Sequence, residues 1–151
     1  MLKLSYQEND INTANLYLQQ SQVERISKLL PSVVSITGLF APERKRVESF
    51  IKQVYAKSYG ADISVDYPML MSVQNTEGKI LAAVGFRYAE KESLFLENYT
   101  EKPIEEVLKT KRSRIVEIGN LASAGKGASI FLFAALSSYL NSKDIEYASI
   151  H

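Results

Sequence analysis

Cysteine is absent from this 151-residue sequence, and histidine occurs once, as the last residue, His151. Without cysteine there can be no disulfide, no thiolate nucleophile and no zinc site built on cysteine. A lone histidine excludes most histidine-ligated metal sites, and no metal site is expected. It also argues against a Ser-His-Asp arrangement, whose base would lie at a chain end. Catalysis would therefore use Asp, Glu, Tyr, Lys, Arg, Ser or the backbone.

Long apolar runs and an excess of either charge are also lacking. The longest uncharged run, Gly127 to Ser142, contains polar residues and is shorter than the ~20 apolar residues that span a bilayer. The N-terminal stretch MLKLSYQENDINT carries charge early and has no apolar core of a secretory signal. A formal net charge of +1 gives no global reason to expect a nucleic acid partner. These features favour a cytoplasmic protein without a transmembrane segment.

The hydrophobic pattern predicts strands interspersed with helices. An apolar stripe at three- and four-residue spacing predicts a helix that starts near Pro42 and stops at Gly60. Two apolar runs around NTEGK predict a β-hairpin. Other strands are predicted at LKLSY, VVSITGLF, SLFLENY (Ser93–Tyr99), RIVEIGNLA and IEYASIH, and other helices at Ile11–Leu30, KPIEEVLKT and GASIFLFAALSSYL. The expected class is α+β (an α/β three-layer arrangement) with a mixed, mostly antiparallel sheet flanked by helices.

The stretch EIGNLASAGKGAS leads from a predicted strand through a loop into a predicted helix. Gly125 and Gly127 would let a ligand approach the backbone, and a helix N-terminus beside Lys126 suits phosphate. The spacing is neither a P-loop GxxxxGK[ST] nor a Rossmann GxGxxG. Taken alone, the loop fits a plain turn as well as a phosphate site.

Two acidic residues interrupt apolar strands, Glu97 in LFLEN and Glu117 in VEIG. A buried carboxylate is costly unless it is paired or protonated, so each is a candidate catalytic base with a raised pKa. Aminolysis of a thioester needs such a base and donors for an oxyanion, but no His, Cys or metal. Alternatively, Glu97 edges a solvated face, and Glu117 is a structural salt-bridge partner of Arg87 or Arg114. Arg87 is then either that partner or an anion clamp in the catalytic site.

The order of the elements, with a Gly-x-Gly loop after the fourth main strand, resembles the GNAT-type acyltransferase fold. That family's pattern is Gln/Arg-x-x-Gly-x-Gly/Ala, and Ala122 stands at its Gln/Arg position here. The resemblance implies that acyl-CoA or an acyl carrier protein binds as a donor substrate, with no permanently bound cofactor. The donor-binding residues it implies are Leu121, Ala122, Ser123, Gly125, Lys126, Gly127 and Ala128.

From about Phe40 onward the chain resembles the thermostable hemolysin family, through LFLENY, PIEE and VEIGNLAS as a set. Members of that family are sequence relatives of GNAT and autoinducer-synthase-like proteins. YGADISVDY and VEIGNLA are also similar to stretches of the acyl-homoserine-lactone synthases. In this sequence Asn120 stands at a position where those enzymes have an Arg. The comparison implies a substrate site with Asp62, Asp66 and Asn120.

Residues 1–31 are interpreted as an N-terminal extension, and residues 32–151 as a GNAT-like domain whose C-terminal part, after a fifth strand, is missing. An unfinished sheet exposes an edge, which predicts a homodimer. Three functions are compatible with the sequence. The first is transfer of an acyl group from a thioester to an amine or similar acceptor. The others are membrane damage without enzymatic activity, and a non-catalytic dimeric binding module.

Overall fold

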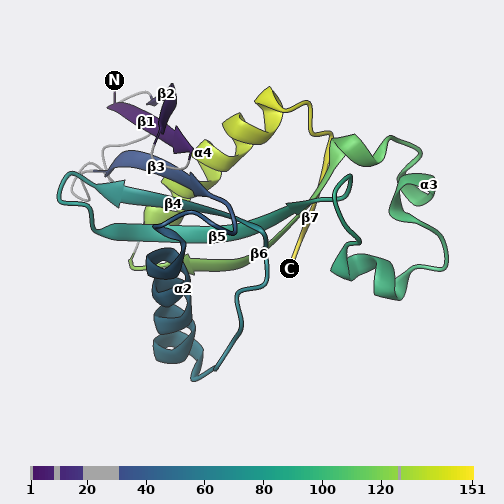
Figure 1. Ribbon diagram of the computed structural model, residues 1–151, viewed down its shortest axis with the longest axis horizontal. Helices are drawn as coiled ribbons and strands as arrows, with labels where there is room; N and C mark the ends of the chain where they lie inside the picture. Colours follow the sequence, from purple (N-terminus) through teal and green to yellow (C-terminus); the bar gives the residue numbers. More distant parts are fainter. Residues whose placement is uncertain (1, 9–10, 19–30, 126) are drawn as a thin grey trace.

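The fold is built on one mixed β-sheet. A computed structural model describes residues 2–8, 11–18, 31–125 and 127–151. The strands are β1 (Leu2–Glu8), β2 (Ile11–Leu18), β3 (Pro31–Thr37), β4 (Met69–Asn75), β5 (Ile80–Tyr88), β6 (Ile115–Ser123) and β7 (Tyr147–Ile150). Within the described residues they form a seven-stranded sheet in the order β2-β1-β3-β4-β5-β6-β7 (Figure 1). The β1/β3 and β6/β7 pairs are parallel and the other four pairs are antiparallel.

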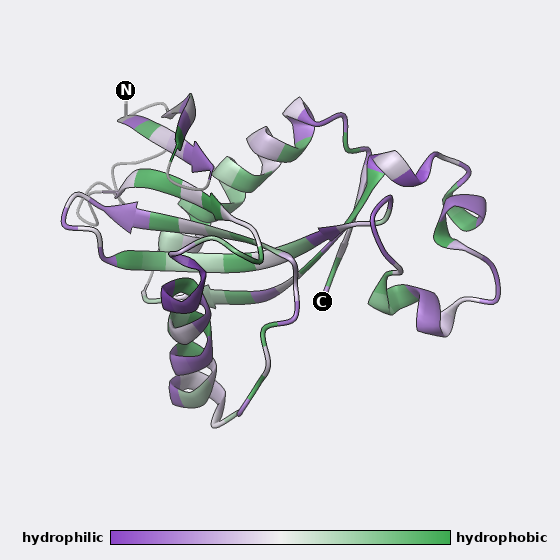
Figure 2. Ribbon diagram, in the orientation of Figure 1, coloured by the Kyte–Doolittle hydropathy of each residue, from purple (hydrophilic) through white to green (hydrophobic). Residues whose placement is uncertain are grey.

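Two helices cover opposite faces of this sheet. Helix α2 (Arg44–Tyr59) packs its buried stripe against a cluster that includes Leu70, whereas α4 (Ala128–Ser142) packs against a cluster that includes Met71. Leu70 and Met71 are successive residues of β4, so their side chains point to opposite faces. Figure 2 shows the apolar central strands and the hydrophilic outer side of α2. The α+β class and the mixed, mostly antiparallel sheet between helices are confirmed.

Most of the predicted elements are present with small changes of boundary. Helix α2 begins at Arg44, two residues after Pro42, which lies in the preceding turn. It ends where predicted, at Gly60, whose φ of 61° is left-handed. The β4–β5 hairpin turns at Gly78, which has a φ of 81°. Strand β1 pairs with β3 in the common sheet, and the division at residue 31 stays a prediction.

The helix predicted for Ile11–Leu30 is wrong over its first part, where β2 pairs antiparallel with β1. The described side chains of β2 are exposed, and Ile11 keeps 68% of its surface accessible. The apolar periodicity of this segment is weak, whereas an edge strand is held by its backbone hydrogen bonds to β1. The rest of the predicted helix, residues 19–30, lies outside the described residues.

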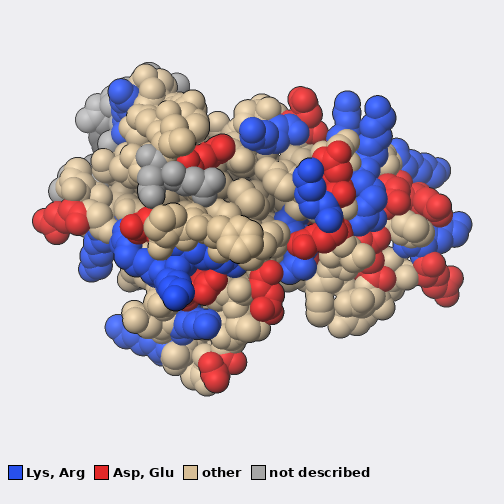
Figure 3. Space-filling view, viewed as in Figure 1, with Lys and Arg blue, Asp and Glu red and all other residues tan. Residues whose placement is uncertain are grey.

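The strand predicted for Ser93–Tyr99 is also wrong. This segment belongs to residues 89–114, which leave the sheet between β5 and β6 and are called the lobe below. The lobe contains a 3₁₀ turn, η2 (Phe95–Tyr99), the short helix α3 (Ile104–Leu108) and a second 3₁₀ turn, η3 (Arg112–Arg114). Figure 1 shows it at the right, beyond the ends of β5 and β6, and Figure 3 shows its surface densely covered with charges of both signs.

Carboxylates replace a neighbouring strand as partners for the backbone in this segment. Glu97 accepts hydrogen bonds from the N–H groups of Leu94, at 2.9 Å, and Ile104, at 3.1 Å. Its two oxygens also accept hydrogen bonds from both terminal nitrogens of Arg112, at 2.9 and 2.7 Å. Because carboxylates accept hydrogen bonds from the backbone N–H groups of LFLEN, this segment does not have to pair with a neighbouring strand.

The ion pair between Glu97 and Arg112 makes Glu97 a structural residue. The Arg112 guanidinium, with help from the Leu94 and Ile104 amides, lowers the pKa of Glu97 to about 2. The predicted increase in this pKa is therefore wrong, because hydrogen-bond donors outweigh desolvation. Arg112 also donates to the carbonyl of Ala89, at 2.7 Å, so one guanidinium ties both ends of the lobe together.

Glu97→Gln should lower the free energy of unfolding at pH 7 by about 2 kcal/mol, since it breaks a partly buried bidentate pair. A depressed folded-state pKa stabilises the protein above the unfolded pKa, and the benefit is lost as pH falls from about 5 towards 2. Urea denaturation at several pH values measures both effects. Wild type should lose more stability than the variant over that pH range. Glu101→Gln, at an exposed lobe residue, is the control, and equal acid sensitivity of all three proteins would contradict the assignment.

Candidate functional site

Glu117 on β6 carries a fully buried carboxylate. Its Oε1 accepts a hydrogen bond from the N–H of Phe95 and its Oε2 from the N–H of Leu96, both at 3.1 Å. Two side chains that can be cationic approach the same oxygens: Arg87 Nε lies 3.2 Å from Oε1, and His151 Nε2 lies 3.1 Å from Oε2. One carboxylate therefore contacts the lobe, β5 and the residue that follows β7.

Arg87 faces Glu117 across the β5–β6 ladder. The Nε–H of Arg87 is not aligned with the carboxylate, so the 3.2 Å contact is an ion pair without a hydrogen bond. The guanidinium lies 4.4 Å from the centre of the Tyr67 ring, a cation–π contact. Glu117 is thus the salt-bridge partner of Arg87, as one of the two alternatives proposed, whereas Arg114 approaches Glu146 at 3.6 Å.

Tyr67 lies flat on two glycines. Gly85 and Gly119 are cross-strand partners on β5 and β6, and a Cβ built on either would come within 2.7 Å of the tyrosine side chain. Only hydrogen at these positions leaves room for the ring. Burial raises the pKa of Tyr67, and the negative charge of Glu117 raises it further. The hydroxyl, like that of an ordinary tyrosine, is protonated at neutral pH and can donate a hydrogen bond.

Strand β6 bulges immediately after Gly119. The register passes from Gly85↔Gly119 to Ala83↔Ala122, so two residues, Asn120 and Leu121, oppose a single residue of β5. Asn120 has a φ of 54°, a left-handed conformation that Asn tolerates better than most residues. Such bulges re-aim side chains, and Asn120 here lines a cavity beside Glu117.

This cavity has a volume of about 350 Å³ and opens on the α2 side of the sheet. Glu117 lies behind the cavity wall. Arg87, Phe95 and His151, which contact Glu117, form part of that wall. The lining residues define what we call the Glu117 cavity: Tyr55, Ser64, Asp66, Tyr67, Arg87, Phe95, Asn120 and His151. Among the described residues, no three His, Asp or Glu side chains are placed to hold a metal ion.

The structure brings together only some of the predicted site residues. Arg87, Asp66 and Asn120 line the Glu117 cavity, whereas Asp62 is exposed and absent from its lining. Glu97 lies in the lobe, paired with Arg112. Of the predicted catalytic and substrate residues, Arg87, Asp66 and Asn120 thus share a cavity with Glu117 behind it, Glu97 is structural, and Asp62 is an exposed residue outside the cavity.

The predicted donor loop lies at the far end of β6. Ala122 is buried against α2, Ser123 Oγ donates a hydrogen bond to the Gly125 carbonyl at 2.8 Å, and Gly127 caps α4 with a φ of 90°. Lys126 lies outside the described residues. From Asn120 to Gly125 an extended chain spans at most ~17 Å, so a ligand that reached both the cavity and the loop would need to span no more than about that distance.

Sequence reasoning did not place five of the lining residues in the site: Tyr55, Ser64, Tyr67, Phe95 and His151. For His151, its place at the end of the chain argues against a Ser-His-Asp base but not against other roles. A usable signal was the parallel strand–helix–strand unit formed by β6, α4 and β7. Its register pairs Ile118 with Ile150, which brings the next residue, His151, beside Glu117.

Fold and cavity define an α+β protein with a candidate small-molecule site on the α2 face of its sheet. The sequence model of the thermostable hemolysin family matches residues 39–150, which is most of the chain. The chain therefore belongs to the thermostable hemolysin family, as its LFLENY, PIEE and VEIGNLAS runs indicated. It matches no curated protein and no solved structure. None of the helices in the described ranges is long and apolar enough to cross a membrane.

Gly119→Ala should destabilise the fold by about 1–3 kcal/mol, because the new methyl group would overlap the Tyr67 ring. Urea denaturation measures the cost. Gly125→Ala is the matched control, since a Cβ there meets no atom within 4 Å and should change stability by less than ~0.5 kcal/mol. In a double-mutant cycle with Tyr67→Ala, the cost of Gly119→Ala should largely disappear. An unchanged cost in the Tyr67→Ala background would refute this packing.

Proposed function

We propose that this protein binds an acyl thioester and transfers the acyl group to an amine at the Glu117 cavity. The observation that carries the proposal is the convergence of Arg87, Tyr67 and His151 on a cavity wall above a wholly buried carboxylate. A base, a cation and a neutral hydroxyl are the groups that aminolysis of a thioester requires. The donor is acyl-CoA or an acyl carrier protein.

The Glu117–His151 pair supplies the base. A carboxylate only accepts hydrogen bonds, so the His151 nitrogen 3.1 Å from Glu117 must carry a proton in that contact. In neutral His151 the other ring nitrogen, Nδ1, is then the acceptor that takes a proton from the attacking amine. Because Glu117 is buried behind the wall, it acts through His151 as a positioning residue that also stabilises the imidazolium once formed.

Tyr67 and Arg87 stabilise the oxyanion that forms as the amine adds to the thioester carbonyl. The Tyr67 hydroxyl is protonated at neutral pH, as tyrosine ordinarily is, and can donate a hydrogen bond; burial and the charge of Glu117 raise its pKa further. The Arg87 guanidinium, stacked on the same ring, adds positive charge beside the developing oxyanion. The proton collected by the base is available to the departing thiolate when the C–S bond breaks.

The β6 bulge and the loop before α4 give the donor its direction. We place the thioester beside Asn120 and extend the donor along the end of β6 towards Gly125 and Gly127. Phosphate groups at that end would meet the N-terminus of a 15-residue helix, whose amides and dipole favour anions. The Ala122 side chain is buried under α2, and the backbone of the loop is left to do the binding.

Release of free thiol from acyl-CoA or acyl carrier protein tests the proposed reaction. The protein has no cysteine, so any thiol detected belongs to the donor. Release should depend on added primary amine, and mass spectrometry should find the amide product. Glu117→Gln and His151→Asn should each lower kcat by about 100-fold or more, since both remove the oriented base. Glu101→Gln in the lobe is the control.

The two variants should fail together. If the pair acts as a unit, the double variant loses little more activity than either single variant, because unit-acting residues are not additive. Circular dichroism at the assay temperature establishes that each variant is folded. Wild-type rates in the folded Glu117→Gln and His151→Asn proteins would refute the proposed base, and the absence of amide with every donor would refute the reaction.

Acyl-CoA should raise the melting temperature by about 5–10 °C at 100 times its Kd, since a ligand at that concentration contributes ~2.7 kcal/mol. Acyl-pantetheine, which lacks the pyrophosphate, should stabilise the protein far less if the loop and α4 hold phosphate. Equal shifts with both donors would remove the loop from the donor site. A shift with acyl carrier protein alone would identify the carrier protein as the donor.

A further inference from the structure

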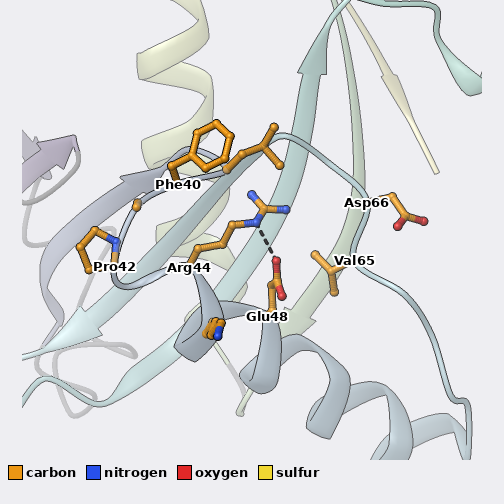
Figure 4. Close-up of a pocket in the computed structure, with 9 residues that line it drawn as sticks. Phe40, Pro42, Arg44, Glu48, Val65 and Asp66 are labelled. Carbon is orange, nitrogen blue, oxygen red and sulfur yellow. Dashed lines mark hydrogen bonds and ion pairs between the residues drawn. The ribbon is translucent and has the colours of Figure 1, made fainter.

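A second and larger hollow adjoins the Glu117 cavity. It has a volume of about 680 Å³ and lies between the turn that follows β3 and the segment that precedes β4 (Figure 4). We call it the α2 cleft, because its floor is the first turn of α2. Its lining residues are Leu39, Phe40, Ala41, Pro42, Arg44, Lys45, Glu48, Val65 and Asp66. Asp66 belongs to the lining of both hollows, so the two lie on either side of this residue.

The floor of the cleft is an internally neutral ion pair. Arg44 Nε donates to Glu48 Oε1 at 2.6 Å, the contact drawn in Figure 4. The same guanidinium donates to the carbonyls of Tyr67, at 2.6 Å, and Pro68, at 3.1 Å. These bonds fix the segment that carries Val65 and Asp66 against α2. The charge of Arg44 is thus used within the protein, and a ligand meets a rigid floor there.

Asp66 is the acid left for a ligand. Its Oδ2 accepts a hydrogen bond from Ser64 Oγ at 2.8 Å. Among the described residues no cation pairs with it and no donor reaches its Oδ1. A carboxylate with a free oxygen between two hollows is placed to hold an ammonium group beside the proposed acyl donor. The cleft also contains one exposed cation without an ion-pair partner in the described chain, Lys45.

The outer wall of the cleft is apolar and exposed. Phe40 keeps 98% of its surface accessible and Leu39 keeps 57%, although the two are adjacent in a tight turn. Val65, on the other side, is buried. In Figure 4 Phe40 lies above the cleft and the Val65 side chain faces it from the opposite side, whereas the Asp66 carboxylate points away from Phe40 and Arg44. Two exposed apolar side chains on the rim of a hollow are available to cover the apolar part of a ligand.

We infer that the α2 cleft is the acceptor site and that the acceptor is a primary amine with an apolar chain. The inference rests on the proposed function. The ammonium group is held by Asp66, and the chain lies along Val65, Leu39 and Phe40. The ammonium first loses one proton to His151, and its nitrogen attacks the thioester carbonyl from the Asp66 side to form a C–N bond. As the C–S bond breaks, His151 gives that proton to the departing thiolate and then takes up the second proton from the new amide nitrogen, which it releases to solvent. The two hollows thus separate acceptor from donor.

Binding of n-butylamine and n-hexylamine, measured by titration calorimetry without any donor, tests the acceptor site. Each added methylene should tighten binding roughly two- to fourfold, as expected for partly or fully buried CH₂ groups. Asp66→Asn should weaken hexylamine binding about tenfold. Its matched control is Asp62→Asn, an exposed aspartate of the same segment that lies outside both linings. Leu39→Ser with Phe40→Ser should abolish the dependence on chain length, whereas Val107→Ser, at an exposed apolar residue of the lobe, should not.

The outcomes separate this inference from the reaction. If amines bind as described but no amide ever forms, the cleft stands and the proposed function fails. If amide forms while Asp66→Asn and the rim variants leave KM for the amine unchanged, the cleft is refuted and the reaction stands. Tighter binding of 6-aminohexanoate than of hexylamine would refute the apolar chain and indicate that Lys45 holds an anionic end. If Leu39→Ser with Phe40→Ser leaves amine binding unchanged and alters only the sedimentation of the protein with lipid vesicles, the acceptor site is likewise refuted.

Discussion

The buried carboxylate of Glu117 is the interaction on which the site depends. Its oxygens satisfy two backbone amides of the lobe, hold Arg87 on the neighbouring strand and contact His151 beyond β7. A carboxylate wholly removed from water is tolerated only with such partners, because desolvation of an unpaired charge costs several kcal/mol. The same charge therefore organises three separate segments and places their side chains around one cavity. Structure and proposed chemistry share a single group.

A second carboxylate stabilises the lobe independently of the first. Glu97 and Arg112 close the lobe, and their contacts lie away from the Glu117 cavity. The Glu97–Arg112 pair affects the cavity indirectly, because Phe95 belongs to the lobe and lines the cavity only if the lobe keeps its shape. Phe95 stacks edge-on against His151, with ring centres 5.4 Å apart. A structural ion pair thereby supports the position of the proposed base through an aromatic contact.

The sequence was sufficient for elements whose apolar pattern is one-sided or continuous. Helix α2 has a one-sided apolar stripe, whereas the β4–β5 hairpin, β6 and α4 have continuous apolar runs, and the α+β class followed from these elements. It was insufficient where side chains replace backbone partners, as in LFLEN, whose apolar run looks like a strand although Glu97 and Glu117 take its amides. The same reason explains the site. Glu117 and Arg87 were identifiable as a pair, but Tyr67 was not, because two glycines 34 positions apart must meet across a ladder to receive its ring.

Residues on the two sides of the β6 bulge obey opposite parity. Before it, the odd-numbered Glu117 and Gly119 face the α2 layer, and after it the even-numbered Ala122 does. Leu121 faces the α4 layer, as does Val84, the residue it would oppose in a regular ladder. Asn120 is thus equivalent to a one-residue insertion in β6 that leaves the apolar side chains before and after it on their correct faces of the sheet. A strand lacking it would keep every apolar side chain on its present side. The sheet does not require this residue, and the hollow beside Glu117 is where its presence has an effect.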